Sequence, residues 1–168
     1  MRIYIVRHAY AGRQDDDDPD DGQRPLKPEG RAVIQALAEY LDKNNMVPNA
    51  IYAARCVRTK ETAQILGDAF GIDPIEEAGL DEKAALDQVV RKLAKNPLIT
   101  RPLLVSHREA IEKGLSRLNM GVDDVEPIAM GELRVLRVDR KGCCWSEKTG
   151  RRVIPSMLDD NFVDYYAS

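Results

Sequence analysis

The sequence lacks the features that mark several large classes of protein. Its three cysteines make an odd count, with Cys143 and Cys144 adjacent, and this is not a disulfide framework. No apolar stretch approaches the roughly 20 residues that span a bilayer, and the apolar run ahead of Arg7 is too short for a signal-peptide core. A net charge of −3 does not indicate a nucleic-acid surface. We therefore expect a cytoplasmic protein with no membrane and no nucleic-acid partner.

The composition that remains is that of a globular protein. Hydrophobic residues make up 43% of the chain and charged residues 32%, as in ordinary soluble domains. A chain of 168 residues is long enough to bury one sizeable core. We expect a single domain over residues 1–168.

Short apolar runs predict the strands. Ile3–Val6, Ala50–Ala53 and Leu103–Ser106 have no polar spacers, as in parallel strands that are covered on both faces. In Leu133–Val138 apolar and charged residues alternate, although not strictly. Together with Cys143–Trp145 this segment predicts an antiparallel hairpin at the edge of the sheet.

Amphipathic segments separate these strands. One begins at Pro28, and the next covers Thr59–Phe70 with Ala69 among its inward-facing residues. Two more follow, around Leu86–Leu93 and Ile111–Leu118, with apolar residues at helical spacing. Strands that alternate with helices predict an α/β fold, a three-layer α/β/α sandwich around a mostly parallel sheet.

The only two histidines follow predicted strands. His8 comes after the first apolar run through Arg7, and His107 directly follows the third. Arg58 comes shortly after the second run. Because parallel strands place their carboxyl ends at the same edge of a sheet, we expect these four side chains around one pocket.

Such a pocket suits phosphoryl transfer. Two guanidiniums match the oxygens of a phosphoryl group. A neutral imidazole is a competent phosphoryl acceptor, and a second imidazole can donate hydrogen bonds to the oxygens. Phosphoryl transfer requires mainly positioning and electrostatic stabilisation, which four basic side chains supply without a metal. We therefore predict His8 as the nucleophile, with no metal and no cofactor.

Four blocks of residues follow one another in a specific order, whereas Arg-His alone would be a weak signal. The blocks are Arg7–Ala9, Arg24–Leu26 with Gly30, Arg58–Ala63 and Val105–His107. Together they resemble the histidine phosphatase superfamily, which is phosphoglycerate mutase-like in fold. Within it, the sequence is most similar to the short SixA-type phosphohistidine phosphatases.

The resemblance implies a two-step mechanism on a phosphorylated protein or a small phosphorylated molecule. His8 attacks phosphorus to give a phosphohistidine enzyme, and water then hydrolyses that intermediate. Arg7, Arg58 and His107 hold the phosphoryl oxygens in both steps.

Other positions near the motifs leave alternatives open. The family often adds a carboxylate that protonates the leaving group; Glu82 is the nearest match by position, Asp81 is its rival, and SixA-type members can act without a dedicated acid. Arg24 either binds substrate or anchors the acidic loop. Ala9 stands where the superfamily has glycine, a replacement that costs energy if the backbone requires a positive φ.

Six aspartates lie within residues 15–21. Their mutual repulsion predicts a solvated segment. A calcium loop is disfavoured because the glutamate that closes an EF-hand loop is missing. A third interpretation is an acidic rim that favours cationic partners.

The leading functional hypothesis is a metal-independent phosphatase that acts on phosphohistidine in proteins, because no cap insertion interrupts the chain and the site is left open. A small-molecule phosphomonoesterase is the alternative. A further alternative is an inactive phosphate- or partner-binding module, against which the intact set of two arginines and two histidines argues. A mutase is disfavoured because it must exclude water during transfer.

Overall fold

The computed structural model describes residues 1–12, 21–118, 126–139, 144–145, 151–155 and 162–165, the last three segments by their backbone. Most of the aspartate-rich segment and Cys143 lie outside these residues. The strands are β1 (Arg2–Arg7), β2 (Ala50–Ala53), β3 (Ile75–Glu76), β4 (Pro102–Ser106), β5 (Leu133–Val138), β6 (Cys144–Trp145), β7 (Arg151–Pro155) and β8 (Phe162–Tyr165).

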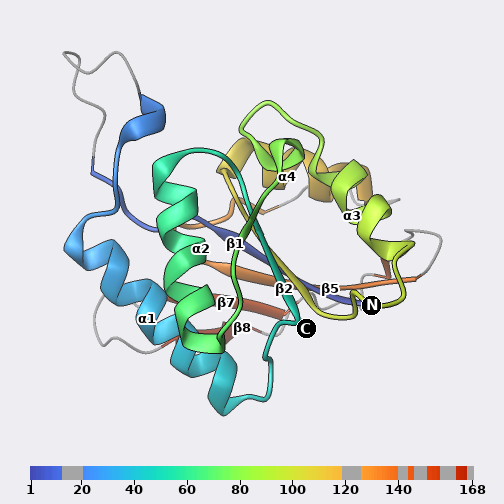
Figure 1. The fold of residues 1–168 in the computed structure, drawn as a ribbon, viewed down its shortest axis with the longest axis horizontal. Helices are drawn as coiled ribbons and strands as arrows, with labels where there is room; N and C mark the ends of the chain where they lie inside the picture. The colour runs from blue at the N-terminus through green and yellow to red at the C-terminus, as the bar shows by residue number, and fades with distance from the viewer. Residues whose placement is uncertain (13–20, 119–125, 140–143, 146–150, 156–161, 166–168) are drawn as a thin grey trace.

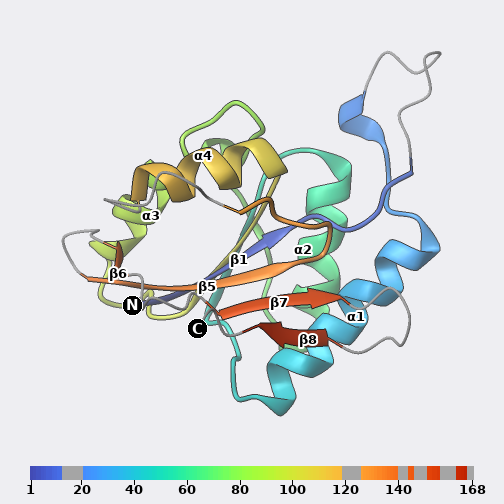
Figure 2. The same ribbon diagram turned by 180° about the vertical axis from the view of Figure 1, so that it is seen from behind.

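Within the described ranges, four α-helices and two short 3₁₀ helices lie between the strands. Figures 1 and 2 show α1 and α2 together on one side of the strands and α3 and α4 together on the other. The helices are α1 (Pro28–Lys43), α2 (Val57–Phe70), α3 (Leu86–Ala94) and α4 (Arg108–Leu118), with 3₁₀ helices η1 (Asp21–Gln23) and η2 (Ala78–Leu80).

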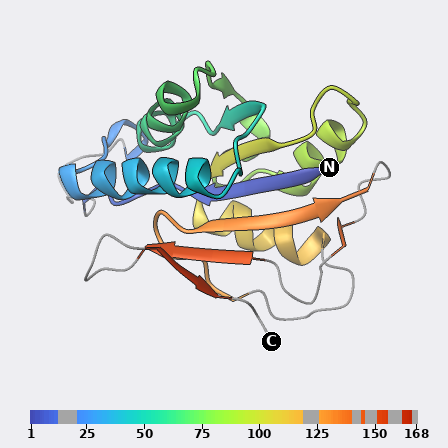
Figure 3. The ribbon, with the colours of Figure 1, turned by 90° about the horizontal axis from the view of Figure 1, so that it is seen from below.

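The sheet has the strand order β3-β2-β4-β1-β5-β7-β8, and β6 pairs with β5. β3, β2, β4 and β1 run parallel to one another, whereas β5 is antiparallel to β1. Beyond β5 the sheet continues through β7 and β8, both in antiparallel pairings, as seen from below in Figure 3. The predicted antiparallel strand is confirmed. Its predicted place at the edge of the sheet is wrong, because β7 pairs with the side of β5 that faces away from β1.

Strand β1 supplies both layers of the core. Its residues alternate between the two faces of the sheet, so that Tyr4 and Val6 pack in one apolar cluster with side chains of α1 and α2. Ile3 and Ile5 pack in a second cluster with side chains of α3 and α4. All four side chains are fully buried, which explains why this strand reads as a continuous apolar run. The predicted α/β sandwich is therefore confirmed.

The local signals at the helix ends act as the sequence indicates. Pro28 opens α1, where its missing N–H costs nothing. Gly71 ends α2 in the left-handed conformation at φ 66°. Ala69 is an exception, because it was predicted to face inward and is exposed. The single-domain assignment stays a prediction.

Gly30, in the first turn of α1, permits a close approach to the backbone that follows β1. A Cβ atom on Gly30 would lie 2.2 Å from the carbonyl oxygen of Tyr10. The N–H of Lys27 donates to that same carbonyl at 3.0 Å. The start of α1 is thus fixed against the segment that leaves His8. Among the described residues, no helix is long and apolar enough to cross a membrane.

Candidate active site

The two histidines lie side by side because the strands that carry them are neighbours. β1 and β4 are parallel, and Arg7 pairs with Ser106 at their carboxyl ends. His8 and His107 each follow one of these paired residues. Their ring centroids are 5.3 Å apart in an edge-to-face arrangement at 62°.

A cleft of about 320 Å³ opens at this edge of the sheet. It brings together all six side chains that the sequence singled out, and five further residues complete its wall. Within the described residues, no group of three or more histidine, cysteine, aspartate or glutamate side chains could hold a metal ion. The cleft is lined by Arg7, His8, Arg24, Arg58, Glu82 and His107, together with Ala11, Gly12, Asp21, Arg108 and Met130.

His8 is held as a neutral imidazole of defined tautomer. Its Nδ1 lies 2.9 Å from the carbonyl oxygen of Ala9. Because a carbonyl can only accept, Nδ1 carries the proton and Nε2 keeps its lone pair. Burial lowers the pKa of His8 to about 3. The hydrogen bond to Ala9 opposes this shift, and electrostatic interactions with Arg58, His107 and Arg7 act in the same direction as burial. His8 therefore has an unprotonated Nε2 with a free lone pair at neutral pH.

His107 has the opposite tautomer. Arg58 Nη2 lies 3.4 Å from its Nδ1, and since a guanidinium can only donate, Nδ1 accepts and Nε2 carries the proton. Nε2 is buried and has no hydrogen-bond partner among the described residues. Burial, followed by the charge of Arg58, lowers the pKa of His107 to about 4. The site thus holds two neutral imidazoles of opposite tautomer. His8 can accept a hydrogen bond at its Nε2, and His107 can donate one from its own Nε2.

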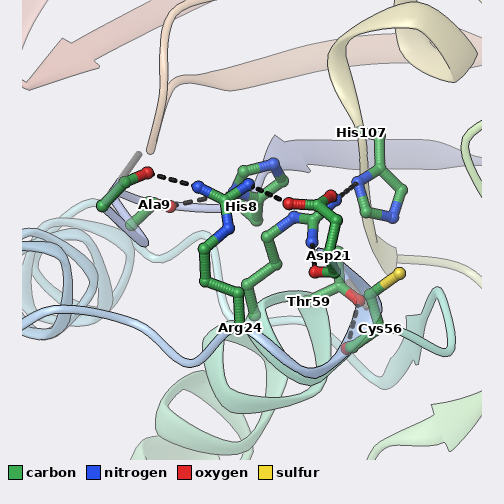
Figure 4. Close-up of polar contacts among 9 residues, drawn as sticks. His8, Ala9, Asp21, Arg24, Cys56, Thr59 and His107 are labelled. Atoms are coloured by element: carbon green, nitrogen blue, oxygen red, sulfur yellow. Dashed lines mark hydrogen bonds and ion pairs between the residues drawn. The ribbon is translucent and has the colours of Figure 1, made fainter. Parts of the chain in front are cut away.

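The Asp21 carboxylate bridges two guanidiniums of the cleft. Its Oδ2 lies 2.9 Å from Arg58 Nη2 and its Oδ1 lies 2.6 Å from Arg24 Nη2, and Figure 4 shows it reaching the Arg24 side chain. Its backbone carbonyl also accepts from Arg58 Nη1 at 2.6 Å. Burial raises the pKa of Asp21, but the charges of Arg58 and Arg24 outweigh burial and lower the pKa overall.

The contacts of Arg24 bear on the two alternatives that the sequence left open for it. It anchors the chain, since it pairs with Asp21 and donates to the carbonyl of Gly12, and it also lines the cleft. The sequence placed Asp21 at the end of a solvated aspartate run. Its spacing of three residues before Arg24 is the signal that could have distinguished it, although this spacing did not enter the prediction.

Arg7 is braced by a turn that the sequence did not single out. Its Nη1 donates to the carbonyl of Ile128 at 2.8 Å. The N–H of Gly131 points at the carbonyls of Arg7 and His8, at 3.1 and 3.3 Å, and Arg7 N–H donates to the carbonyl of Glu132. Gly131 has φ 74°, a conformation that glycine adopts without strain. The turn over residues 128–132 therefore fixes the backbone of the Arg-His pair.

The two carboxylates considered as the acid have different surroundings. Asp81 accepts from Arg55 twice, from the backbone N–H at 2.9 Å and from Nε at 2.7 Å. Glu82 is exposed and lines the cleft. The Ser106 hydroxyl donates to the carbonyl of Leu80, which ties this segment to the end of β4. The geometry therefore places Glu82, and not Asp81, at the cleft.

Ala9 fits its position without strain. It is 1% exposed, and Asn45 has the only positive φ among the described residues other than glycine. Alanine thus incurs no left-handed backbone cost here. Its N–H lies 3.5 Å from Thr62 Oγ1, and the Thr62 hydroxyl donates to the carbonyl of Arg58 at 2.8 Å. One threonine links the backbone after His8 to the first turn of α2.

Comparison with known proteins identifies the family. Residues 3–89 match the histidine phosphatase superfamily (branch 1). Because this match covers more than half of the 168 residues, the chain belongs to that superfamily. His107 lies beyond the matched residues and joins the site through the pairing of β1 with β4.

Solved structures share the fold at low sequence identity. The protein histidine phosphatase SixA complexed with tungstate is 19% identical, with a TM-score of 0.75, over 86% of this chain and 93% of its own. A protein from Agrobacterium tumefaciens assigned as SixA is 24% identical, with a TM-score of 0.68, over 80% and 90%. A mycobacterial glucosyl-3-phosphoglycerate phosphatase is 17% identical, with a TM-score of 0.63, over 85% and 94%. No curated protein matches the sequence.

Proposed function

We propose that the protein is a phosphatase that hydrolyses phosphohistidine through a covalent phosphohistidine intermediate on His8. The observation that carries this proposal is the hydrogen bond from His8 Nδ1 to the carbonyl of Ala9. It leaves the Nε2 lone pair available in a cleft lined by Arg7, Arg58 and His107. A nitrogen nucleophile among fixed cationic donors is the arrangement that phosphoryl transfer requires.

The reaction proceeds in two displacements at phosphorus. In the first, the His8 Nε2 lone pair forms a P–N bond as the bond from phosphorus to the leaving group breaks. In the second, a water oxygen attacks phosphorus, the His8–phosphorus bond breaks, and inorganic phosphate leaves with the water's oxygen. Arg7, Arg58 and His107 stabilise the charge on the equatorial oxygens in both steps.

The leaving group takes up one proton in the first displacement. Glu82 is the proposed donor, since it lines the cleft and Asp81 is engaged by Arg55. In the second displacement the resulting carboxylate accepts a proton from the attacking water. An imidazole leaving group from phosphohistidine requires less protonation than an alkoxide, so the contribution of Glu82 is largest on phosphate esters.

The nature of the cleft supports a phosphorylated protein as the substrate. In the ranges that the structure describes, no inserted cap domain separates the strands and helices, which favours access of a phosphorylated side chain to His8. Two of the structural neighbours are SixA proteins, one of them complexed with tungstate, a tetrahedral oxyanion. Arg24 is the proposed further contact to the substrate, and a cytoplasmic location stays part of the proposal.

A small-molecule phosphomonoesterase is the second candidate, favoured by the fold shared with a glucosyl-3-phosphoglycerate phosphatase. The deciding experiment compares kcat/KM for a phosphohistidine protein with kcat/KM for sugar and aryl phosphates. We expect the phosphohistidine protein to be preferred and His8→Ala to remove all activity. Faster turnover of the small esters would favour the second candidate. Absence of hydrolysis with every substrate would leave a binding module.

A further inference from the structure

Arg108 adds a cation to the cleft that the two-step mechanism does not use. It directly follows His107 at the start of α4 and lines the cleft. Its side chain is 54% exposed, and its Nε pairs with Glu112 Oε1 at 3.0 Å. In the part of the chain that the structure describes, its two Nη atoms have no hydrogen-bond or ion-pair partner.

The backbone of Ile128 supports both Arg7 and Arg108, the latter through Glu112. Glu112 Oε1, which accepts from Arg108, also accepts from the backbone N–H of Ile128 at 3.1 Å. The carbonyl of Ile128 accepts from Arg7 Nη1 at 2.8 Å. Ile128 is 1% exposed, so the support is part of the packed core. Two guanidiniums are therefore fixed near each other before any substrate binds, which reduces the entropy lost on binding an anion.

The side chains that line the cleft carry more positive charge than negative charge. Four guanidiniums and two carboxylates line it, and one of the carboxylates, Asp21, is already paired with Arg24 and Arg58. After burial, the charge of Arg108 is the next influence that lowers the pKa of Arg7. Glu82 is the other carboxylate in the wall. When a phosphoryl group is held by Arg7 and Arg58, the outer guanidinium, Arg108, is paired through Nε with Glu112 alone among the described residues. Its two Nη atoms are then available to a further anionic group.

We propose that Arg108 binds a second anionic group of the substrate, a carboxylate that lies next to the phosphoryl group. This inference rests on the proposed function and names a feature of the substrate. The carboxylate belongs either to a small phosphorylated acid or to an acidic side chain beside a phosphohistidine. Arg108 is then a specificity residue, and Glu112 is its positioning residue.

Binding of matched phosphonates tests the proposal without requiring turnover. The first pair is 4-(phosphonomethyl)phenylacetate and its amide, which differ in one charge. The second pair is a peptide that carries a stable phosphonate analogue of phosphohistidine next to glutamate or next to glutamine. We expect at least one carboxylate ligand to bind the wild type about tenfold more tightly than its amide partner, which corresponds to about 1.4 kcal/mol.

Two variants on the same helix separate the subsite from general charge effects. In Arg108→Gln the Kd ratio is expected to fall close to one. Arg117→Gln is the matched control, since Arg117 is similarly exposed, at 47%, and pairs with Asp87 away from the cleft. It should keep the wild-type ratio. Glu112→Gln should give an intermediate ratio, because Arg108 loses its anchor.

The outcomes are distinct from those for the proposed function. A preference in the aryl pair alone identifies a small acid, and a preference in the peptide pair alone identifies an acidic side chain. Equal Kd values in both pairs, no binding of any of these ligands, or an unchanged ratio in Arg108→Gln would overturn the proposal. A failure of the proposed function would instead appear as the absence of hydrolysis and of a phosphoenzyme.

Discussion

Acidification tests how the cleft holds its two histidines. At pH 5 an ordinary imidazole with a pKa near 6.5 is about 97% protonated. Burial and neighbouring cations lower the pKa of His8 to about 3 and that of His107 to about 4. With these values, about 1% of His8 and about 10% of His107 would be protonated at pH 5. Both imidazoles should therefore stay neutral through the range in which histidines normally titrate.

The assay is an NMR titration of the imidazole nitrogens and ring protons. The chain has only two histidines, so the His8→Ala variant assigns both sets of signals. We expect no titration between pH 7.5 and pH 5, with Nδ1 protonated in His8 and Nε2 protonated in His107. A midpoint near 6.5 for His8 would refute the reasoning, because it would show an imidazole that water solvates freely.

The same lowered pKa values set the direction of the stability change. Between the folded values and the unfolded value near 6.5, the unfolded chain binds more protons than the folded one. The free energy of unfolding should therefore fall as the pH drops from about 6.5 towards 4 and then towards 3. Replacing both histidines with glutamine should flatten this part of the profile, as measured by urea unfolding.

Three substitutions test other parts of the account. Gly30→Ala should lower the free energy of unfolding by about 3 kcal/mol in urea denaturation, because its Cβ would meet the carbonyl of Tyr10. Asp21→Asn should tighten the inhibition constant of inorganic phosphate about fivefold, since the carboxylate that pairs with Arg58 no longer competes with an anion. Glu82→Gln should slow hydrolysis of alkyl phosphates about 100-fold and leave substrates with good leaving groups nearly unaffected.

Two of these substitutions have a control in the same chain, and the third has an outcome that would contradict it. Gly71→Ala meets no atom within 4 Å and should cost only the left-handed backbone penalty, about 1 kcal/mol. Asp81→Asn should not reproduce the leaving-group dependence of the Glu82 variant. Weaker phosphate inhibition in Asp21→Asn would contradict competition and would show that the carboxylate orients Arg58.

The fold class could be predicted from the sequence because a strand that is buried on both faces appears as a continuous apolar run. Ile3–Val6 and Leu103–Ser106 are continuous apolar runs and were predicted as parallel strands. That β1 and β4 are neighbours was not predicted, because an apolar run does not encode which strand it pairs with. The continuation of the sheet beyond Leu133–Val138 could not be predicted from the sequence. The tail from Arg151 gave no clear period, and strand pairing between segments far apart in the chain depends on contacts that local patterns do not encode.

Some residues of the cleft could be predicted from the sequence, and others could not. Arg7, His8, Arg58 and His107 were found because each follows a strand that the pattern identifies. The supporting contacts were missed, since Asp21 reads as one of six aspartates and Gly131 as a loop glycine. Their importance comes from tertiary contacts, to Arg24 and Arg58 in one case and to the backbone of the Arg-His pair in the other.

Identification of the phosphorylated residue during turnover tests the central claim most directly. The protein is mixed with a ³²P-labelled phosphoramidate and quenched in alkali, which preserves phosphohistidine, and the labelled peptide is sequenced. The account predicts a label on His8 that is stable in alkali, labile in acid and absent from His8→Ala. Turnover without a label, or a label on His107, would contradict it.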